Sequence, residues 1–159
     1  MLSDIKTILY STDLKGDGRE KAYKMAIGLA KNAGARVIVL HAFETSTQLP
    51  AVFENVLSDE MLERFKSVGL EERKAELLER IQQYCEREFP GEDYPGGEPT
   101  VLVREGKPQR VILEVAEQQQ VDMIVMGTRT HTSLGDGLLG STATKVIHRS
   151  KIPVLIYPL

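Results

Sequence analysis

Cysteine, tryptophan and long apolar runs are scarce or missing in this chain of 159 residues. The only cysteine is Cys85, which excludes an internal disulfide and a multi-cysteine metal site. The longest apolar runs, VIVL at 37–40 and MIVM at 123–126, are far too short to cross a bilayer. The first residues lack the basic and apolar regions of a signal peptide. We therefore expect a cytoplasmic protein with no membrane partner.

An excess of basic charge is also missing. The chain has 20 lysine and arginine residues against 23 aspartate and glutamate residues, for a net charge of −3. Domains that bind nucleic acids normally present a basic face, so we expect no nucleic-acid partner. The apolar share of 42% and the charged share of 27% are typical of a globular protein. The length fits a single domain over residues 1–159.

The residue patterns of common enzymes do not occur either. The sequence has no G-x-S-x-G nucleophile elbow. Its histidines, His41, His131 and His148, have no serine or carboxylate partner at a recognisable spacing. No pair of histidine, cysteine or aspartate residues has the spacing of a metal site. These absences disfavour an enzyme of another α/β family, and we expect neither catalytic residues nor a metal site.

Short β-branched runs alternate with amphipathic segments along the whole chain. Strands are expected at 7–11, 36–44, 100–106, 121–127 and 152–158, and helices at 17–33, 58–89, 108–120 and 141–150. Such alternation predicts an α/β fold, with a parallel open sheet and helices on both of its faces.

Individual residues predict where these helices begin, end and face. Gly34 is a natural C-terminal cap, and Pro108 is suited to the first turn of a helix. The long charged helix at 58–89 is expected to bury an apolar stripe that includes Leu78. Gly69 is a point at which that helix is open to bending.

The glycine-rich loop after the fourth expected strand resembles two nucleotide-binding motifs without matching either. GDGLLG at 135–140 has the spacing G-x-G-x-x-G, but the nearest strand ends eight residues before Gly135. A dinucleotide fingerprint directly follows its strand, so this match is discounted. The same stretch approaches a P-loop, yet Ser141 stands where that motif needs lysine. A P-loop NTPase is therefore disfavoured.

Two interpretations of Gly140, Ser141 and Thr142 stay open on local features. A helix that begins here offers unpaired N–H groups and a positive dipole end to an anion. Gly127 permits close approach of the backbone at the preceding strand end, and Arg129 adds positive charge. Alternatively, Ser141 is a plain helix cap and nothing more. In open α/β sheets, ligands bind beyond the carboxyl ends of the strands, where YSTD and MGTR lie.

Taken together, several segments resemble the universal stress protein family. They are ILYSTD, VIVLHA, VREGKPQRVI, VDMIVMGTR and GLLGSTATKVIHRSKIPVLIYP, in family order over nearly the whole chain. The resemblance implies a Rossmann-like sheet of the adenine nucleotide alpha hydrolase type, with strand order 3-2-1-4-5. It also implies a regulatory protein of the stress response that binds ATP, alone or with Mg²⁺.

The resemblance also implies the residues of an adenine-nucleotide site. Asp13 would lie near the ribose and adenine, Ala42 would line the adenine pocket, and Ser141 would meet the phosphates. A turn-forming role is the alternative for Asp13. The complete implied set is Ser11, Thr12, Asp13, Ala42, Met126, Gly127, Arg129, Thr130, Gly140, Ser141 and Thr142.

One position departs from the family's ATP-binding motif, G-x2-G-x9-G-[ST]. Gly127 and Gly140-Ser141 match it, but Thr130 replaces the middle glycine. If that backbone needs a positive φ, a β-branched residue costs about 1–3 kcal/mol, or roughly one to two decades in affinity. The expectation is therefore weakened ATP binding and, without a lysine or general base, at most slow hydrolysis. The alternative is a non-nucleotide-binding stress protein that acts as a dimeric partner-binding module.

The apolar segment PVLIYPL at 153–159 predicts an assembly. Family members commonly dimerise through the last strand, and an uncovered apolar edge strand invites pairing with another chain. Two-fold pairing closes such a contact. We therefore expect a homodimer formed through the C-terminal strand.

Overall fold

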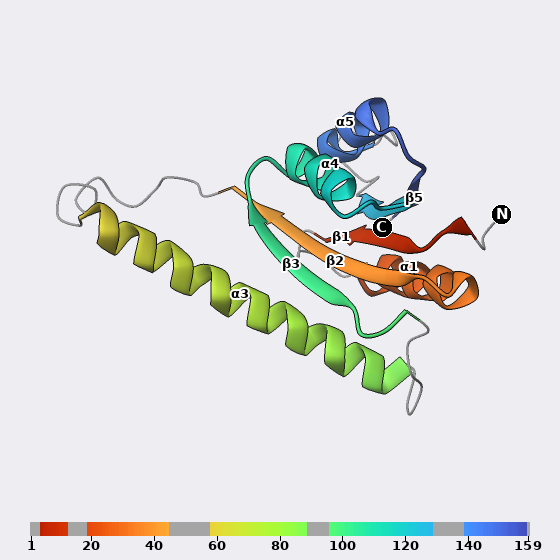
Figure 1. Ribbon diagram of the computed structural model, residues 1–159, viewed down its shortest axis with the longest axis horizontal. Helices are drawn as coiled ribbons and strands as arrows, with labels where there is room; N and C mark the ends of the chain where they lie inside the picture. The colour runs from red at the N-terminus through yellow and green to blue at the C-terminus, as the bar shows by residue number, and fades with distance from the viewer. Residues whose placement is uncertain (1–3, 13–18, 45–57, 89–95, 129–138, 159) are drawn as a thin grey trace. The chain divides into compact units, whose positions relative to one another are not determined.

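The computed structural model describes residues 4–12, 19–44, 58–88, 96–128 and 139–158 (Figure 1). Its elements are β1 (Thr7–Ser11), α1 (Arg19–Ala33), β2 (Arg36–Phe43), α3 (Asp59–Glu88), β3 (Thr100–Glu105), α4 (Pro108–Gln118), β4 (Met123–Thr128), α5 (Ser141–Arg149) and β5 (Val154–Pro158). The expected alternation of strands and helices is confirmed. The chain forms two compact units, residues 44–92 with α3 and the remainder with the sheet. The single domain over 1–159 stays a prediction.

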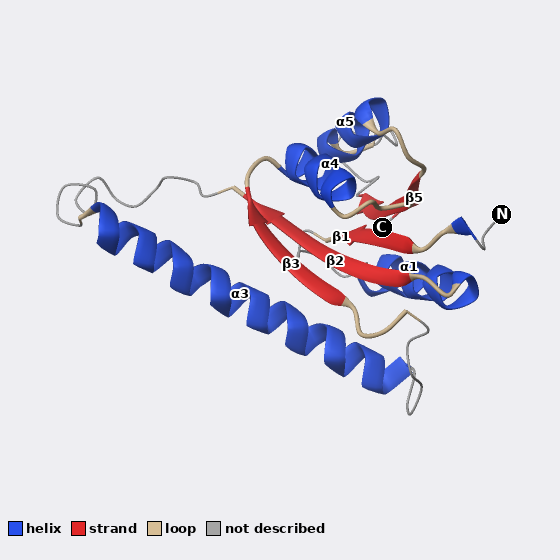
Figure 2. Cartoon of the chain, in the orientation of Figure 1, coloured by secondary structure: helices blue, strands red, loops and turns tan. Residues whose placement is uncertain are grey.

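The sheet has five parallel strands in the order β3-β2-β1-β4-β5 (Figure 2). This order is the predicted 3-2-1-4-5. Helix α1 covers one face of the sheet, and α4 and α5 cover the other (Figure 1). Alternate residues of the central strand β1 serve the two faces. Leu9 joins the apolar cluster that includes α4 and α5, whereas the ring of Tyr10 lies 5.4 Å from that of Tyr23 on α1.

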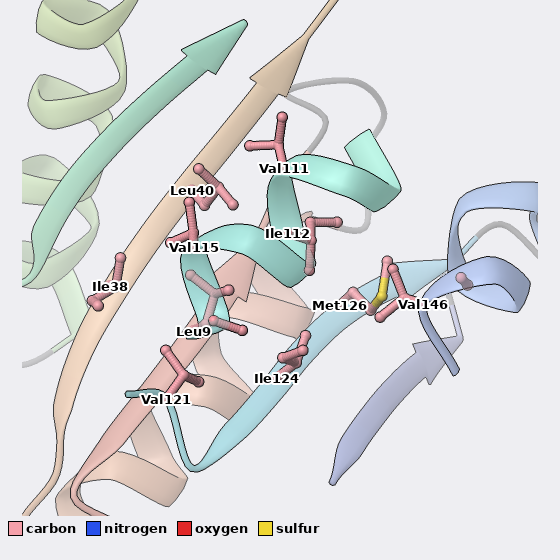
Figure 3. Close-up of a cluster of buried hydrophobic side chains, with 12 residues drawn as sticks. Leu9, Ile38, Leu40, Val111, Ile112, Val115, Val121, Ile124, Met126 and Val146 are labelled. Atoms are coloured by element: carbon pink, nitrogen blue, oxygen red, sulfur yellow. The ribbon is translucent and has the colours of Figure 1, made fainter. Parts of the chain in front are cut away.

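The main apolar cluster lies between the sheet and the pair α4 and α5 (Figure 3). Each fully buried leucine, isoleucine or valine in such a core contributes about 1.5–3 kcal/mol relative to an exposed one. Apolar residues at alternate strand positions and at helical spacing along α4 pack against each other in this one layer. The cluster consists of Leu9, Ile38, Leu40, Val111, Ile112, Val115, Ala116, Val121, Ile124, Met126, Ala143 and Val146.

The predicted helix ends at Gly34 and Pro108 are confirmed. Gly34 has a φ of +66°, and the N–H of Ala35 donates to the carbonyl of Ala30 at 2.9 Å. A second bond runs from the N–H of Gly34 to the carbonyl of Lys31 at 3.4 Å. These two bonds form a Schellman motif, whose left-handed position glycine occupies without strain. Pro108 is the first residue of α4.

Helix α3 runs without interruption from Asp59 to Glu88, so Gly69 does not divide it. The prediction that Leu78 belongs to its buried stripe is wrong, since Leu78 is 41% exposed and Leu77 is only 4% exposed. Successive side chains of a helix point about 100° apart around its axis. Selecting Leu78 in place of Leu77 therefore rotates the predicted buried face by that angle. No helix in the described ranges has both the length and the apolar composition needed to cross a membrane.

A partly buried carboxylate, that of Asp122 just before β4, links β4 to β1 at the amino ends of the strands. Oδ2 of Asp122 accepts hydrogen bonds from the backbone N–H of Lys6 at 2.8 Å and of Thr7 at 2.9 Å. The N–H of Asp122 donates in return to the carbonyl of Thr7 at 2.9 Å. The pairing that follows places Ser11 beside Met126 at the other end of the two strands. Asp122 therefore helps to set the register on which the carboxyl edge depends.

We expect Asp122→Ala to lower the free energy of unfolding by about 1–3 kcal/mol, because two backbone donors lose their acceptor. Urea denaturation followed by circular dichroism measures the change. Glu117→Ala, which removes an exposed carboxylate from α4, is the control and should change stability by less than about 0.5 kcal/mol. Equal effects of the two substitutions would show that Asp122 does not hold the strands together.

Candidate functional site

A cleft of about 280 Å³ opens at the carboxyl ends of β1 and β4. These strands are adjacent, and the chain leaves β1 for β2 on one side while β4 lies on the other. The connections therefore diverge at this point and leave a gap between them, as expected at a switch in strand order. The predicted position of the ligand site, between the first and fourth strands, coincides with this cleft.

The cleft brings together most of the site residues predicted from the sequence. Those that line it are Ser11, Thr12, Ala42, Met126, Gly127, Gly140, Ser141 and Thr142. Asp13, Arg129 and Thr130 lie outside the described residues. The eight lining residues thus lie together in the structure, while the binding role of each stays a prediction.

Several lining residues were not predicted. They are Tyr10, Pro108, Ile112, Thr128 and Ala143. Pro108 and Ile112 are one turn apart at the start of α4, which places both on one helix face. That spacing is visible in the sequence, but nothing in it shows that the first turn of α4 reaches the ends of β1 and β4. Thr128 had a weak signal as a polar residue that ends a buried strand.

The start of α5 bears on one of the two interpretations of Ser141, the plain helix cap. The N-cap residue is Gly140, with φ −55° and ψ 154°, and no side chain makes a capping hydrogen bond there. Ser141 is instead the first helical residue, so its interpretation as a plain cap is wrong. The first-turn N–H groups of a helix have no carbonyl partner within the helix. In α5, the residues that carry these groups, Ser141, Thr142 and Ala143, line the cleft.

The opposite wall of the cleft is held by His41. The N–H of Thr12 donates to the carbonyl of Leu40 at 2.9 Å, which extends the pairing of β1 with β2. The carbonyl of Thr12 lies 2.9 Å from Nδ1 of His41. Because a carbonyl can only accept, Nδ1 carries the proton and donates. The His41 ring is 8% exposed and lies parallel to that of Phe43. It does not line the cleft, so its contact with the site passes through Thr12.

The described lining consists of two kinds of residue. Ala42, Ile112 and Met126 supply apolar surface, and Ser11, Thr12, Thr128, Ser141 and Thr142 supply hydroxyl groups. No charged side chain belongs to the lining among the residues that the structure describes. A ligand with a flat apolar part and an anionic part suits this division, with the anion at the N-terminus of α5.

Comparison with known proteins agrees with the sequence resemblance. The model of the universal stress protein family matches residues 4–158. The chain belongs to the universal stress protein family. A universal stress protein of Thermus aquaticus is 33% identical over 151 residues, covering 95% of this chain and 97% of that protein. The structure of the Methanocaldococcus jannaschii universal stress protein MJ0577 is 28% identical, with a TM-score of 0.70, covering 98% of this chain and 96% of that one.

A more distant universal stress protein, from Archaeoglobus fulgidus, has been solved in complex with dAMP. It is 23% identical to this chain, with a TM-score of 0.55, and the alignment covers 95% of this chain and 96% of that one. At this identity the similarity shows the fold alone. The parallel sheet with order β3-β2-β1-β4-β5 is thus the family's fold.

In this universal stress protein we expect His41→Leu to lower the free energy of unfolding by about 1–3 kcal/mol. The substitution removes the buried hydrogen bond that Nδ1 of His41 donates to the carbonyl of Thr12. His41→Asn is the matched control, because its amide nitrogen stands near the position of Nδ1 and can donate the same bond. Chemical denaturation measures both variants. A His41→Asn protein as unstable as His41→Leu would mean that ring packing, not the hydrogen bond, is what His41 provides.

Proposed function

We propose that this universal stress protein is a regulatory protein of the stress response that binds adenine nucleotides, with ATP, alone or with Mg²⁺, as its ligand. One observation carries the proposal. Residues that the family resemblance assigns to the nucleotide line a single cleft at the switch point of the sheet, although they come from four separate elements. The dAMP bound by the relative from Archaeoglobus fulgidus supports the same class of ligand.

The proposed orientation follows from the division of the lining. The adenine ring lies against Ala42, Ile112 and Met126, where burial of its apolar faces is favourable. The phosphates lie at the first turn of α5, where the N–H groups of Ser141 and Thr142 donate to them. The chain of the nucleotide runs past Gly127 and Gly140, which line the cleft between these two ends.

The proposed site binds phosphate without a lysine clamp in its described part. Each charge at a helix N-terminus contributes typically about 0.3–1 kcal/mol, and rarely more than about 2 kcal/mol. The predicted cost of Thr130 reduces the affinity further. Moderate or weak affinity and slow hydrolysis at most are therefore part of the proposal.

Calorimetric titration of the purified protein tests it. We expect saturable binding of ATP at or below millimolar concentration, with weaker binding of adenosine, which lacks the phosphates. GTP should bind more weakly than ATP if the base is recognised. An absence of heat at millimolar ATP, with and without Mg²⁺, would favour the alternative function, a dimeric partner-binding module.

Two substitutions should change the affinity for ATP in opposite directions. Ala42→Ile fills the apolar part of the cleft and should weaken ATP binding more than tenfold, with an unchanged circular dichroism spectrum. Thr130→Gly restores the family motif and should tighten binding by roughly one to two decades. If neither substitution alters the affinity for ATP, the nucleotide binds elsewhere on the protein.

We further propose that the protein is a homodimer paired through β5. This strand is an edge of the sheet, and its apolar side chains Val154, Leu155 and Ile156 are only partly buried in the single chain. An edge strand with free backbone groups and apolar side chains is a template for pairing with a second copy. A two-fold axis through the pair satisfies both edges at once.

Leu155→Asp should convert this dimer to a monomer, because it places a charge in the proposed interface. Leu155 is the better test position, since Ile156 also packs against the core cluster and its replacement would disturb the fold. Val68→Asp, on an exposed site of α3, is the matched control. Analytical ultracentrifugation measures the mass of each variant. A Leu155→Asp protein that sediments like the unmodified chain would count against pairing through β5.

A further inference from the structure

Gly140 is held on both sides by hydrogen bonds within the protein. Its N–H donates to Oγ1 of Thr128 at 3.1 Å. Its carbonyl accepts from the N–H of Thr144 at 3.0 Å and from Oγ1 of Thr144 at 3.1 Å. The residue directly before the first turn of α5 is thus attached both to the end of β4 and to its own helix.

The contact with Thr128 also explains why residue 140 is a glycine. Its φ of −55° is open to any residue, so backbone conformation does not require glycine here. A Cβ at this position would lie 3.3 Å from Oγ1 of Thr128, closer than most real contacts of a Cβ. The close approach of the α5 N-terminus to the Thr128 hydroxyl therefore favours glycine in this chain.

Thr128 is well placed to hold this geometry. It is the last residue of β4 and only 4% exposed, so neighbouring strands fix its position. Its hydrogen bond spans twelve positions of the sequence and joins β4 directly to the start of α5. Both ends of this bond line the cleft. The family motif includes Gly127 and Gly140, whereas Thr128 lies at one of its variable positions.

We propose that Thr128 is a positioning residue for the phosphate-binding end of the cleft. Its hydroxyl holds Gly140, and through it the first-turn N–H groups of Ser141 and Thr142, in place before a ligand arrives. This inference rests on the proposed nucleotide-binding function. Donors that are already ordered spare the ligand the entropy of ordering them, so preorganisation raises affinity. Because the bond lies at the phosphate end, it affects phosphate-bearing ligands and leaves recognition of the base unchanged.

Thr128→Val tests the proposal, since valine keeps the shape and removes the acceptor. We expect the affinity for ATP to fall about tenfold, which corresponds to about 1.4 kcal/mol. The affinity for adenosine should not fall with it. Thr128→Ser retains the hydroxyl and should restore the affinity for ATP. Thr7→Val is the matched control, because Thr7 is also a buried strand threonine whose Oγ1 accepts a hydrogen bond, at 3.1 Å from Nε of Arg36.

A second measurement needs no nucleotide. Hydrogen exchange of the Gly140 amide, followed by NMR, should be at least tenfold faster in Thr128→Val than in the unmodified protein and the Thr7→Val control. If Thr128→Val does not fold, Gly140→Ala serves instead, since its Cβ crowds Oγ1 of Thr128 and should weaken ATP binding but not adenosine binding.

The outcomes separate this proposal from the proposed function. An unmodified protein that binds no adenine nucleotide overturns the function, while the exchange rate still tests the hold on Gly140. Binding of ATP with equal affinity by the unmodified chain and Thr128→Val overturns the positioning role. An equal loss of ATP and adenosine binding also overturns it, because the effect would then not be confined to the phosphate end.

Discussion

The parallel pairing of β1 with β2 on one side and β4 on the other is the constraint on which the rest of the structure depends. Because both neighbours run in the same direction, the carboxyl ends of the three strands meet at one edge of the sheet. The register that places Ser11 beside Met126 then decides which residues face each other there. The cleft is a consequence of this topology, and its lining is a consequence of the register.

Two hydrogen bonds from side chains to backbone keep the walls of the cleft in place. His41 holds Thr12 at the end of β1, and Thr128 holds Gly140 at the start of α5. The bond of His41 is buried and that of Thr128 is partly buried, and loss of a buried hydrogen bond is costly because it leaves a polar group unpaired. These walls are therefore held by contacts that belong to the fold itself.

Much of this fold could be predicted because local chemistry and global topology agree. The β-branched runs marked the strands, and Gly34 and Pro108 marked helix ends through the backbone angles that each residue prefers. The residues of the proposed site came from a family motif, which specifies residues but not their contacts. The hydrogen bond of Thr128 could not be predicted from local sequence because its partner, Gly140, is twelve positions away. The error at Leu78, and the shift of the helix cap from Ser141 to Gly140, are each displacements of one residue, which periodicity alone does not resolve.

The proposed way of binding has a consequence for regulation. Backbone N–H groups and hydroxyls recognise phosphate with less charge than a lysine clamp supplies, so the dissociation constant is raised. The occupancy of a site changes most when the ligand concentration is near its dissociation constant. A site of modest affinity therefore responds to changes in the concentration of a plentiful nucleotide, whereas a tight site stays saturated. Binding also stabilises the native state by RT ln(1 + [L]/Kd), about 2.7 kcal/mol at one hundred times Kd. In the proposed complex the ligand would bridge β1, β4 and α5, so the stabilisation would act on the carboxyl edge of the sheet, whose order would follow the nucleotide concentration.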